Sequence, residues 1–224
     1  IHDSSYLFSL ESSCLANKST FQSGDNFLCE DSFYSIKAAA GLAVEAAKLA
    51  LEGQSSFALT RPPGHHAARR TAEGFCFINH AALVTAHINE ETPDAQVIIV
   101  DIDVHHGNGT QKIYEYRSDV LFYSIHISPE VSYPFSGKSE EEGLKEGLGY
   151  TVNVPMPHHC SGQEWLKALS TTLTASFEKI NPDYLVLCLG FDAHQEDPTE
   201  LMKLTDQDYL VAAELISSLA RQSN

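Results

Sequence analysis

The chain has 224 residues, with 14 Lys or Arg against 30 Asp or Glu, and its formal net charge is −16 at pH 7. This charge argues against a nucleic-acid binder, which presents basic residues to phosphates, and against a partner on an anionic membrane surface. Apolar residues make up 43% of the chain, a globular balance that excludes disorder and suits one large domain.

The first part of the chain predicts loop, then a helix, then a strand. Residues 1–30 are rich in Ser, Asn and Asp, so we expect mostly loop there. From Phe33 to Ala50, apolar residues recur every three or four positions, which predicts a helix. Ser56–Thr60 is typical of a short buried strand, and it ends at Arg61-Pro62-Pro63-Gly64 because proline cannot continue a ladder.

The rest of the chain alternates helices and strands. Gln96–Ile102 is a continuous β-branched run, typical of a strand covered on both faces of a parallel sheet. The other expected elements are strands over Val120–Ile125, Tyr150–Val154 and Tyr184–Leu189, and helices over Ile78–Glu90, Gln163–Ile180 and Asp206–Ala220. Capping pairs start the last two helices, namely Ser161 with Glu164 and Thr205 with Asp208. This alternation predicts an α/β fold with a mostly parallel, doubly wound sheet flanked by helices.

Groups that bind metals or transfer protons follow three of the expected strands. They are His65 and His66 after the first, Asp101, Asp103, His105 and His106 at the end of Gln96–Ile102, and Asp192 and His194 after Tyr184–Leu189. Ligands of parallel α/β sheets bind beyond the carboxyl ends of the strands. We therefore expect these groups to converge at one edge of one sheet.

The spacing of Asp103 and His105 favours a metal site. Residues two apart in an extended segment point to the same side, so both can bind one ion, and Asp101 can support them or bind a second ion. Asp192 would complete a set of two carboxylates and one imidazole. Three protein ligands with an open position are typical of catalytic zinc, although without a thiolate the set also suits iron or manganese.

Other motifs are weaker. Asp101–Gly109 superficially suggests a calcium loop, but His106 and Lys112 stand where an EF-hand needs Gly and Glu. The Gly-rich residues 107–110 lack the lysine of a P-loop. We expect structural rather than catalytic roles for the remaining clustered or isolated groups, namely His158, His159, Cys160, His2, His80 and His87.

The five cysteines are widely spaced and include no Cys-x-x-Cys pair, which predicts reduced thiols. No secretory signal opens the sequence, and no apolar run approaches the roughly 18–20 residues of a membrane span. We therefore expect an intracellular protein, cytoplasmic or, in a eukaryote, nuclear.

Four motifs in order carry a family resemblance. They are Arg61-Pro-Pro-Gly-His-His66, Glu73-Gly-Phe-Cys-Phe-Ile-Asn79, Asp101-Ile-Asp-Val-His-His-Gly-Asn-Gly-Thr-Gln111 and Leu189-Gly-Phe-Asp192. Together they resemble the zinc-dependent histone deacetylase and acetylpolyamine amidohydrolase family, and Asn108 with Arg61-Pro-Pro resembles its class II branch. The resemblance implies an arginase/deacetylase-like three-layer sandwich and a single catalytic domain over residues 1–224.

Carried over by position, the resemblance implies three ligands of one zinc ion, namely Asp103, His105 and Asp192. His65 and His66 resemble the paired active-site histidines, with Asp101 and Asn108 as their respective hydrogen-bonding partners. His66 would be the general base toward a zinc-activated water and then the acid toward the leaving amine, a role that suits an imidazole.

The resemblance also implies a substrate tunnel and a potassium site. The residues that resemble the tunnel wall are Arg61, Gly74, Phe75 and Tyr133. Tyr133 stands where the family usually places a second Phe, so the aromatic wall is kept and a hydroxyl is added. The residues that resemble the potassium site are Asp101, Asp103, His105, Ser124 and Ile125. A cation held there would support the zinc ligands from below.

One family feature is missing from the sequence. The family's transition-state tyrosine lies in a Gly-Gly-x motif after a further strand, and no Gly-Gly pair occurs here. We therefore expect an incomplete catalytic domain that lacks strands at both ends and leaves a sheet edge unpaired. Loss of such a hydroxyl contact lowers a rate by roughly 10²–10³.

Three functions fit these residues. The first is a metal-dependent amidohydrolase that removes acetyl or related acyl groups from an acetylated lysine peptide, an acetylated protein or an acetylated polyamine. The second is an arginase-like dimanganese ureohydrolase, which Asp192-Ala193-His194 partly resembles. The third is a non-catalytic module that binds acyl-lysine or polyamine. The first accounts for all four motifs, and the negative net charge suits cationic substrates.

Overall fold

The computed structural model describes residues 1–223, and the chain divides into two compact units. The first unit comprises Ile1–Asp94 and Asn108–Ile113, and the second comprises Ala95–Gly107 and the chain from Tyr114 onward. The division does not test the prediction of a single catalytic domain over residues 1–224, which stays a prediction.

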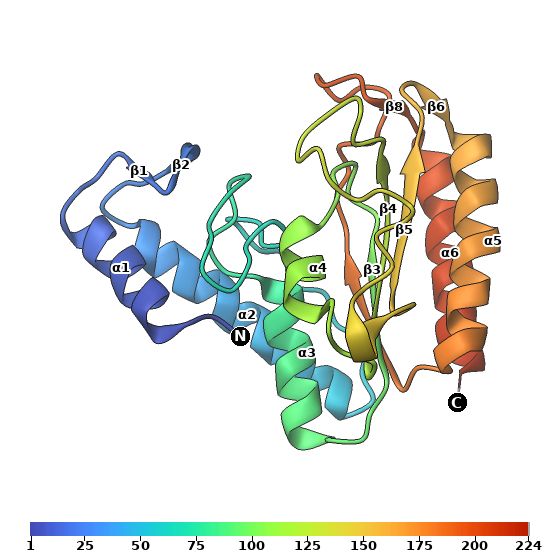
Figure 1. The fold of residues 1–224 in the computed structure, drawn as a ribbon, viewed down its shortest axis with the longest axis horizontal. Coiled ribbons are helices and arrows are strands. Elements are labelled where there is room, and N and C mark those ends of the chain that lie inside the picture. The colour runs from blue at the N-terminus through green and yellow to red at the C-terminus, as the bar shows by residue number, and fades with distance from the viewer. Residues whose placement is uncertain (224) are drawn as a thin grey trace. The chain divides into compact units, whose positions relative to one another are not determined.

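A four-stranded parallel sheet forms the centre of the second unit (Figure 1). Its strands, in the spatial order β5-β4-β3-β7, are β5 (Thr151–Met156), β4 (Val120–Ile127), β3 (Val97–Asp101) and β7 (Tyr184–Cys188). Every residue of β3 and β4 is buried, as the β-branched run predicts for strands covered on both faces. The predicted α/β class with a mostly parallel sheet is confirmed.

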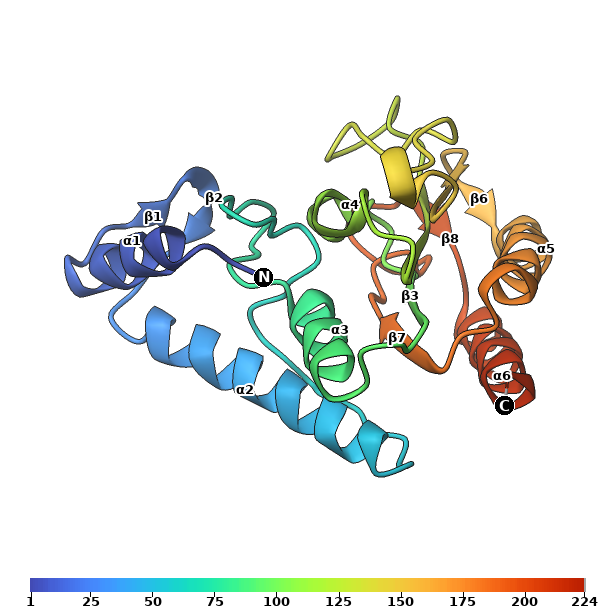
Figure 2. The same ribbon diagram turned by 60° about the horizontal axis from the view of Figure 1, so that its bottom comes forward.

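Helices α5 (Gly162–Ile180) and α6 (Asp206–Gln222) lie side by side along this sheet (Figures 1 and 2). Trp165 and Leu169 of α5 and Ile216 of α6 belong to the same buried core as the sheet residues Ile98 and Leu121. Both predicted capping boxes are present, at Ser161 and Thr205. A 3₁₀ turn over Lys145–Gly147 precedes β5, and a small parallel pair, β6 (Cys160–Ser161) with β8 (Met202–Lys203), completes the unit.

The first unit is mainly helical. Its elements are α1 (Ser4–Leu15), the antiparallel pair β1 (Thr20–Phe21) and β2 (Ser23–Phe27), α2 (Ser32–Leu51) and α3 (His80–Glu91). The short α4 (Asn108–Tyr114) belongs to this unit except for its last residue. Tyr6 and Leu10 of α1, Ile36 of α2 and Phe77 form the core.

The prediction of loop over the first 30 residues is wrong, because α1 and the β1–β2 pair lie there. Tyr6, Leu10 and Cys14 recur at every fourth position and form the buried face of α1. The low apolar contrast of the other positions hid this stripe. The many Ser residues between these positions made the segment look like a loop, although the spacing of its apolar residues is that of a helix.

The predicted strand over Ser56–Thr60 is also wrong. These residues form no strand, and the side chains of Phe57 and Leu59 are mainly exposed, at 70% and 81%. A strand needs a neighbour to receive its backbone hydrogen bonds, and no strand of the described chain pairs with this segment. The strand over Tyr184–Leu189 exists as β7, but it lies at the sheet edge and is only partly buried.

Asn79 joins three segments of the first unit. Its Oδ1 accepts the N–H of Ala82 at 2.9 Å and caps α3, while its Nδ2 donates to Ala67 O at 2.9 Å and to Thr110 Oγ1 at 3.0 Å. The side chain is fully buried. Losing the cap and leaving a buried carbonyl without its donor each cost on the order of 1 kcal/mol or more.

We therefore expect Asn79→Ala to lower the free energy of unfolding by about 2 kcal/mol. Asn79→Ser keeps a capping oxygen but no amide donors, so we expect it to lower the free energy of unfolding by a smaller amount. Urea unfolding followed by circular dichroism measures both changes. An unchanged midpoint for Asn79→Ala would contradict this account of the side chain.

All five cysteines are free, as their spacing predicts. Among the described residues, no helix combines the length and apolar character needed to cross a membrane.

Candidate metal centre

The connections of the sheet reverse direction between β3 and β7. The chain steps from β3 to β4 to β5 on one side and then returns to place β7 on the other side of β3. At such a reversal the loops beyond the carboxyl ends of the two strands separate and leave room for a ligand. Asp103 and His105 follow β3, and Asp192 follows β7, so the topology brings these three residues to this point.

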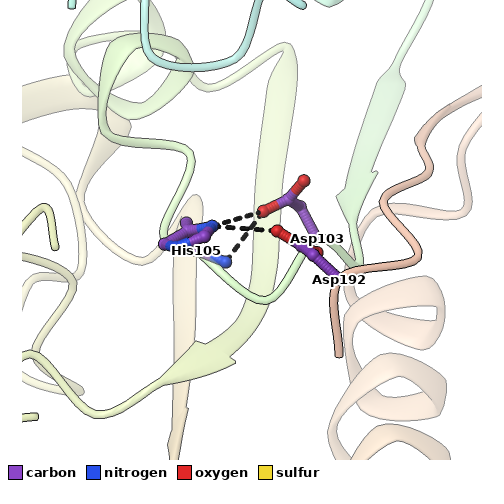
Figure 3. Close-up of side chains that lie close together, drawn as sticks. All are labelled: Asp103, His105 and Asp192. Carbon is purple, nitrogen blue, oxygen red and sulfur yellow. Dashed lines mark hydrogen bonds and ion pairs between the residues drawn. The ribbon is translucent and has the colours of Figure 1, made fainter. Parts of the chain in front are cut away.

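The side chains of Asp103, His105 and Asp192 face one another there (Figure 3). The Nδ1 atom of His105 lies 3.2 Å from Asp103 Oδ1 and 3.0 Å from Asp192 Oδ2. One ligand atom from each residue can be chosen so that all three lie within 4.8 Å of one another, the only such group of three found in residues 1–223. The side chains are 21–26% exposed, so the group is reachable from solvent.

The backbone after β3 is folded around the same carboxylates. Asp103 Oδ1 accepts the N–H of His105 at 2.8 Å, and Asp192 Oδ1 accepts the N–H of Val104 at 2.9 Å. Asp101 Oδ1 accepts the N–H of Asp103 at 3.2 Å. Short acidic side chains that bond to a backbone N–H nearby stabilise a turn. The spacing Asp-x-Asp-x-His therefore fixes both the turn and the direction of its side chains.

Two carboxylates around one imidazole make this site strongly attractive to a cation. Burial by itself lowers the pKa of His105, but hydrogen bonds and charge from Asp103 and Asp192 outweigh it and raise the pKa to about 10. The pKa of Asp192 is raised by burial and then by the charge of Asp103, although His105 and the Val104 N–H oppose this. Without a metal, the proton on His105 supplies the positive charge that the two carboxylates require.

Gly190 makes the close approach of the segment after β7 to Asp103 possible. A Cβ atom at position 190 would lie 2.7 Å from Asp103 Cγ and 2.9 Å from Asp103 Cα, and closer still to Asp103 Oδ2. Such distances require atoms to move. In the sequence, Gly190 stands within the motif Leu189-Gly-Phe-Asp192, which does not by itself indicate this contact. Its position directly after a strand and two residues before a ligand is the signal that could have marked it.

Three of the residues that resemble the potassium site lie on neighbouring strands of the second unit, and Asp103 and His105 follow the first of these strands. Asp101 at the end of β3 is the register partner of Ser124 on β4, and Ile125 follows it. Asp101, Ser124 and Ile125 are all buried.

The two predicted catalytic histidines belong to the first unit. Their ring centroids are 4.0 Å apart, and both side chains are buried. His66 Nδ1 lies 2.7 Å from Asn108 Oδ1, and the N–H of Thr110 donates to His65 O at 3.1 Å. The start of α4 is thus held against both histidines. No strand carries them, so the expectation that they follow a strand end is wrong, because Ser56–Thr60 forms none.

Gly74 and Phe75 form the tip of a tight turn in the first unit. The N–H of Cys76 donates to Glu73 O at 3.0 Å, and both central residues have positive φ, +57° and +64°. Two positive φ values in succession are typical of a type I′ turn, where Gly and Asn are favoured. Phe75 is 57% exposed in this strained conformation. A strained and exposed aromatic residue motivates a test of ligand binding at this turn.

We expect Phe75→Asn to stabilise the protein and weaken ligand binding. Asn tolerates the left-handed conformation that costs most other residues about 1–2 kcal/mol, so the free energy of unfolding should rise by about 1 kcal/mol. Thermal unfolding measures the first effect, and titration with an acetyl-lysine peptide measures the second. A destabilised Phe75→Asn protein would show that the exposed ring supports the fold instead.

The remaining predicted residues belong to one or the other unit. Tyr133 in the second unit lies beside the metal group, with its ring centroid 6.3 Å from that of His105 and an edge-on arrangement. Arg61 is exposed at the start of its turn in the first unit. The rings of His158 and His159 stack at 3.7 Å without a third metal-binding residue among those described.

Known proteins resemble this chain in sequence. The family described as the histone deacetylase domain matches residues 1–224. Acetylpolyamine amidohydrolase 1 of Pseudomonas aeruginosa is 42% identical over 167 residues, which cover 74% of this chain and 48% of that protein. Histone deacetylase 15 of Arabidopsis thaliana is 35% identical over 225 residues, covering 98% of this chain and 40% of that protein. The chain thus spans about half the length, or less, of these relatives.

Solved structures also resemble this chain. The crystal structure of the HDA15 HD domain matches with a TM-score of 0.91 at 33% identity and covers 100% of this chain and 64% of that one. The structure of a deacetylase homologue from Aquifex aeolicus matches with a TM-score of 0.89 at 29% identity, covering 98% and 61%. These likenesses confirm the predicted fold class and the resemblance seen in the four motifs. The chain therefore belongs to the histone deacetylase domain family.

Proposed function

We propose that the chain forms the metal-binding part of an amidohydrolase that removes acetyl or related acyl groups from acylated amines. The observation that carries this proposal is the group Asp103, His105 and Asp192 at the reversal point of the sheet. The names of the relatives, acetylpolyamine amidohydrolases and histone deacetylases, support the reaction class. The proposed activity is that of the whole protein, and this chain supplies the residues named here.

The donor set fits a zinc ion. Two carboxylates and one imidazole leave a coordination position open, as catalytic zinc requires, and the raised pKa of His105 reflects the demand of the two carboxylates for a cation. A bound zinc ion lowers the pKa of a water molecule and polarises a carbonyl group. Asp101, Ser124 and Ile125 would hold potassium close to the same ligands.

His66 is suited to move a proton. The Asn108 Oδ1 can only accept, so His66 Nδ1 donates its N–H to it at 2.7 Å. In the neutral ring, Nε2 then carries the lone pair that receives a proton and can return it to a leaving amine. Asn108 thereby fixes the tautomer, and His65 packs against the same ring. Phe75 of the first unit, with Gly74 and Arg61, would supply one apolar wall for the alkyl stem of a substrate. Tyr133 of the second unit would supply another.

The substrate class is an acyl group on a cationic amine, either acetyl-lysine in a protein or an acetylated polyamine. The net charge of −16 favours approach of such cations.

Metal stoichiometry and acetate release test the proposal together. We expect about one divalent ion per chain, and metal-dependent acetate release from an acetyl-lysine peptide or an acetylpolyamine. His66→Ala should abolish the release and leave metal binding unchanged, which makes it the matched control. Two ions with urea released from arginine would favour a ureohydrolase. Binding of the acylated amine without acetate release, both in this chain and in a longer one that carries a Gly-Gly-x-Tyr segment, would favour a binding module.

A further inference from the structure

Two buried histidines of the second unit, His106 and His126, take no part in the metal group. Their ring centroids are 4.6 Å apart, and their exposed fractions are 1% and 0%. His106 follows the ligand His105 directly, and His126 lies on β4. A polar ring in the core needs hydrogen-bond partners. The partners of His106 and His126 indicate the role of this pair.

The tautomer of His126 follows from its partners. Its Nε2 lies 2.9 Å from the carbonyl oxygen of Gly137, which can only accept, so Nε2 carries the proton and donates. Its Nδ1 lies 2.8 Å from Ser124 Oγ, and in the neutral ring this nitrogen accepts from the hydroxyl. His126 therefore connects β4 to the segment around Gly137.

The same segment rests directly on both rings. His106 Nδ1 is hydrogen-bonded to Ser136 Oγ at 2.9 Å. Gly137 has a φ of +90°, and a Cβ atom there would lie 2.5 Å from His126 Nε2 and 2.6 Å from His106 Cγ. Only glycine satisfies both the backbone conformation and this contact. Two consecutive residues, Ser136 and Gly137, are thus fastened to two neighbouring buried imidazoles.

These contacts lie in the long connection between β4 and β5, which also carries Tyr133. Tyr133 is three residues before Ser136, and its ring lies beside that of the metal-binding His105. We propose that His126, with His106, is a positioning residue that anchors the Ser136–Gly137 corner and thereby holds Tyr133 beside the metal centre. The expected effect of this anchor on the binding of an acylated substrate rests on the proposed function.

Two substitutions at position 126 separate anchoring from simple packing. His126→Gln places an amide donor near the position of Nε2 and keeps the bond to Gly137 O, whereas the shorter His126→Asn reaches only toward Ser124. We expect hydrogen exchange of the backbone amides at 131–138 to rise by about tenfold in His126→Asn and to stay near the native rate in His126→Gln. The ring signals of Tyr133 in NMR spectra should shift with the first variant and not with the second.

Gly137→Ala tests the contact from the other side. The added Cβ should raise hydrogen exchange at the same amides and shift the same Tyr133 signals. The double variant with His126→Asn should show little further exchange, because the same contact is lost in both single variants. Glu141 Oε1 also accepts the N–H groups of Gly137 and Lys138. Native exchange in both His126→Asn and Gly137→Ala would mean that Glu141 holds the corner alone and would overturn the proposal.

Metal and substrate binding distinguish this proposal from the proposed function. Divalent-metal affinity should stay within about threefold of native in His126→Asn, and affinity for an acetyl-lysine peptide should fall and be restored in His126→Gln. Released amides with unshifted Tyr133 signals would overturn the positioning role. A native protein that binds neither metal nor peptide would overturn the proposed function, and the exchange and NMR comparison would still decide the anchor.

Discussion

Replacing Asp192 by Asn is expected to weaken divalent-metal binding by more than about a hundredfold. Changing a residue that merely supports a ligand costs 10–100-fold in metal affinity, so loss of a ligand's charge should cost more. Asn keeps the size of the side chain and an oxygen for the Val104 N–H, which Asp192 Oδ1 accepts at 2.9 Å. The fold should therefore survive. Isothermal titration with Zn²⁺ against a competing chelator measures the affinity.

The same substitution should act on His105 in the metal-free protein. Hydrogen bonds and charge from Asp103 and Asp192 raise the pKa of His105 to about 10, so removing one charge should lower that pKa, which an NMR titration of the ring detects. Glu196→Gln, an exposed carboxylate four residues further on, is the matched control and should change neither quantity. Native metal affinity in Asp192→Asn would remove Asp192 from the site.

Local signals in the sequence predicted most of the second unit. The capping pairs at Ser161 and Thr205 are satisfied within one helical turn, so their effect does not depend on distant residues. The β-branched run of β3 indicates burial because both faces of a parallel strand are covered. The ligand spacing at Asp103 and His105 is equally local. Asp192 was added because groups at the carboxyl ends of parallel strands were expected to converge, and β3 and β7 are neighbours in the sheet.

Features that depend on distant contacts were not predictable in this way. Ser56–Thr60 has the composition of a strand, but no strand of the described chain pairs with it. The short helix α4 begins with Asn108-Gly109-Thr110, a poor helical sequence, and its start is hydrogen-bonded to His65 and His66 instead. The anchor at His126 was missed because a single His in an apolar strand gives no indication of its partner eleven residues later.

Gly190 also depends on a residue that is distant in sequence, because it lies against Asp103. Its replacement gives the second large expected effect. The Cβ atom of Gly190→Ala would lie within 2.7 Å of Asp103 Cγ and 2.9 Å of its Cα, so the carboxylate and the backbone that carries it must both move. We expect zinc affinity to fall by about ten- to a hundredfold, as for loss of a residue that orients a ligand. Metal titration measures this, and the visible spectrum of the Co²⁺-loaded protein should change because the ligands no longer converge in the same geometry.

Gly41→Ala is the control for Gly190→Ala, because a Cβ atom at this interior position of α2 meets nothing within 4 Å. It should raise the free energy of unfolding by about 1 kcal/mol through helix propensity and leave zinc affinity unchanged. If the contact with Asp103 is the cause, Gly190→Ala should destabilise the metal-free native protein more than it destabilises the Asp103→Ala protein, where the carboxylate is gone. Equal losses in the two backgrounds would assign the effect to the backbone near β7 and not to the ligand.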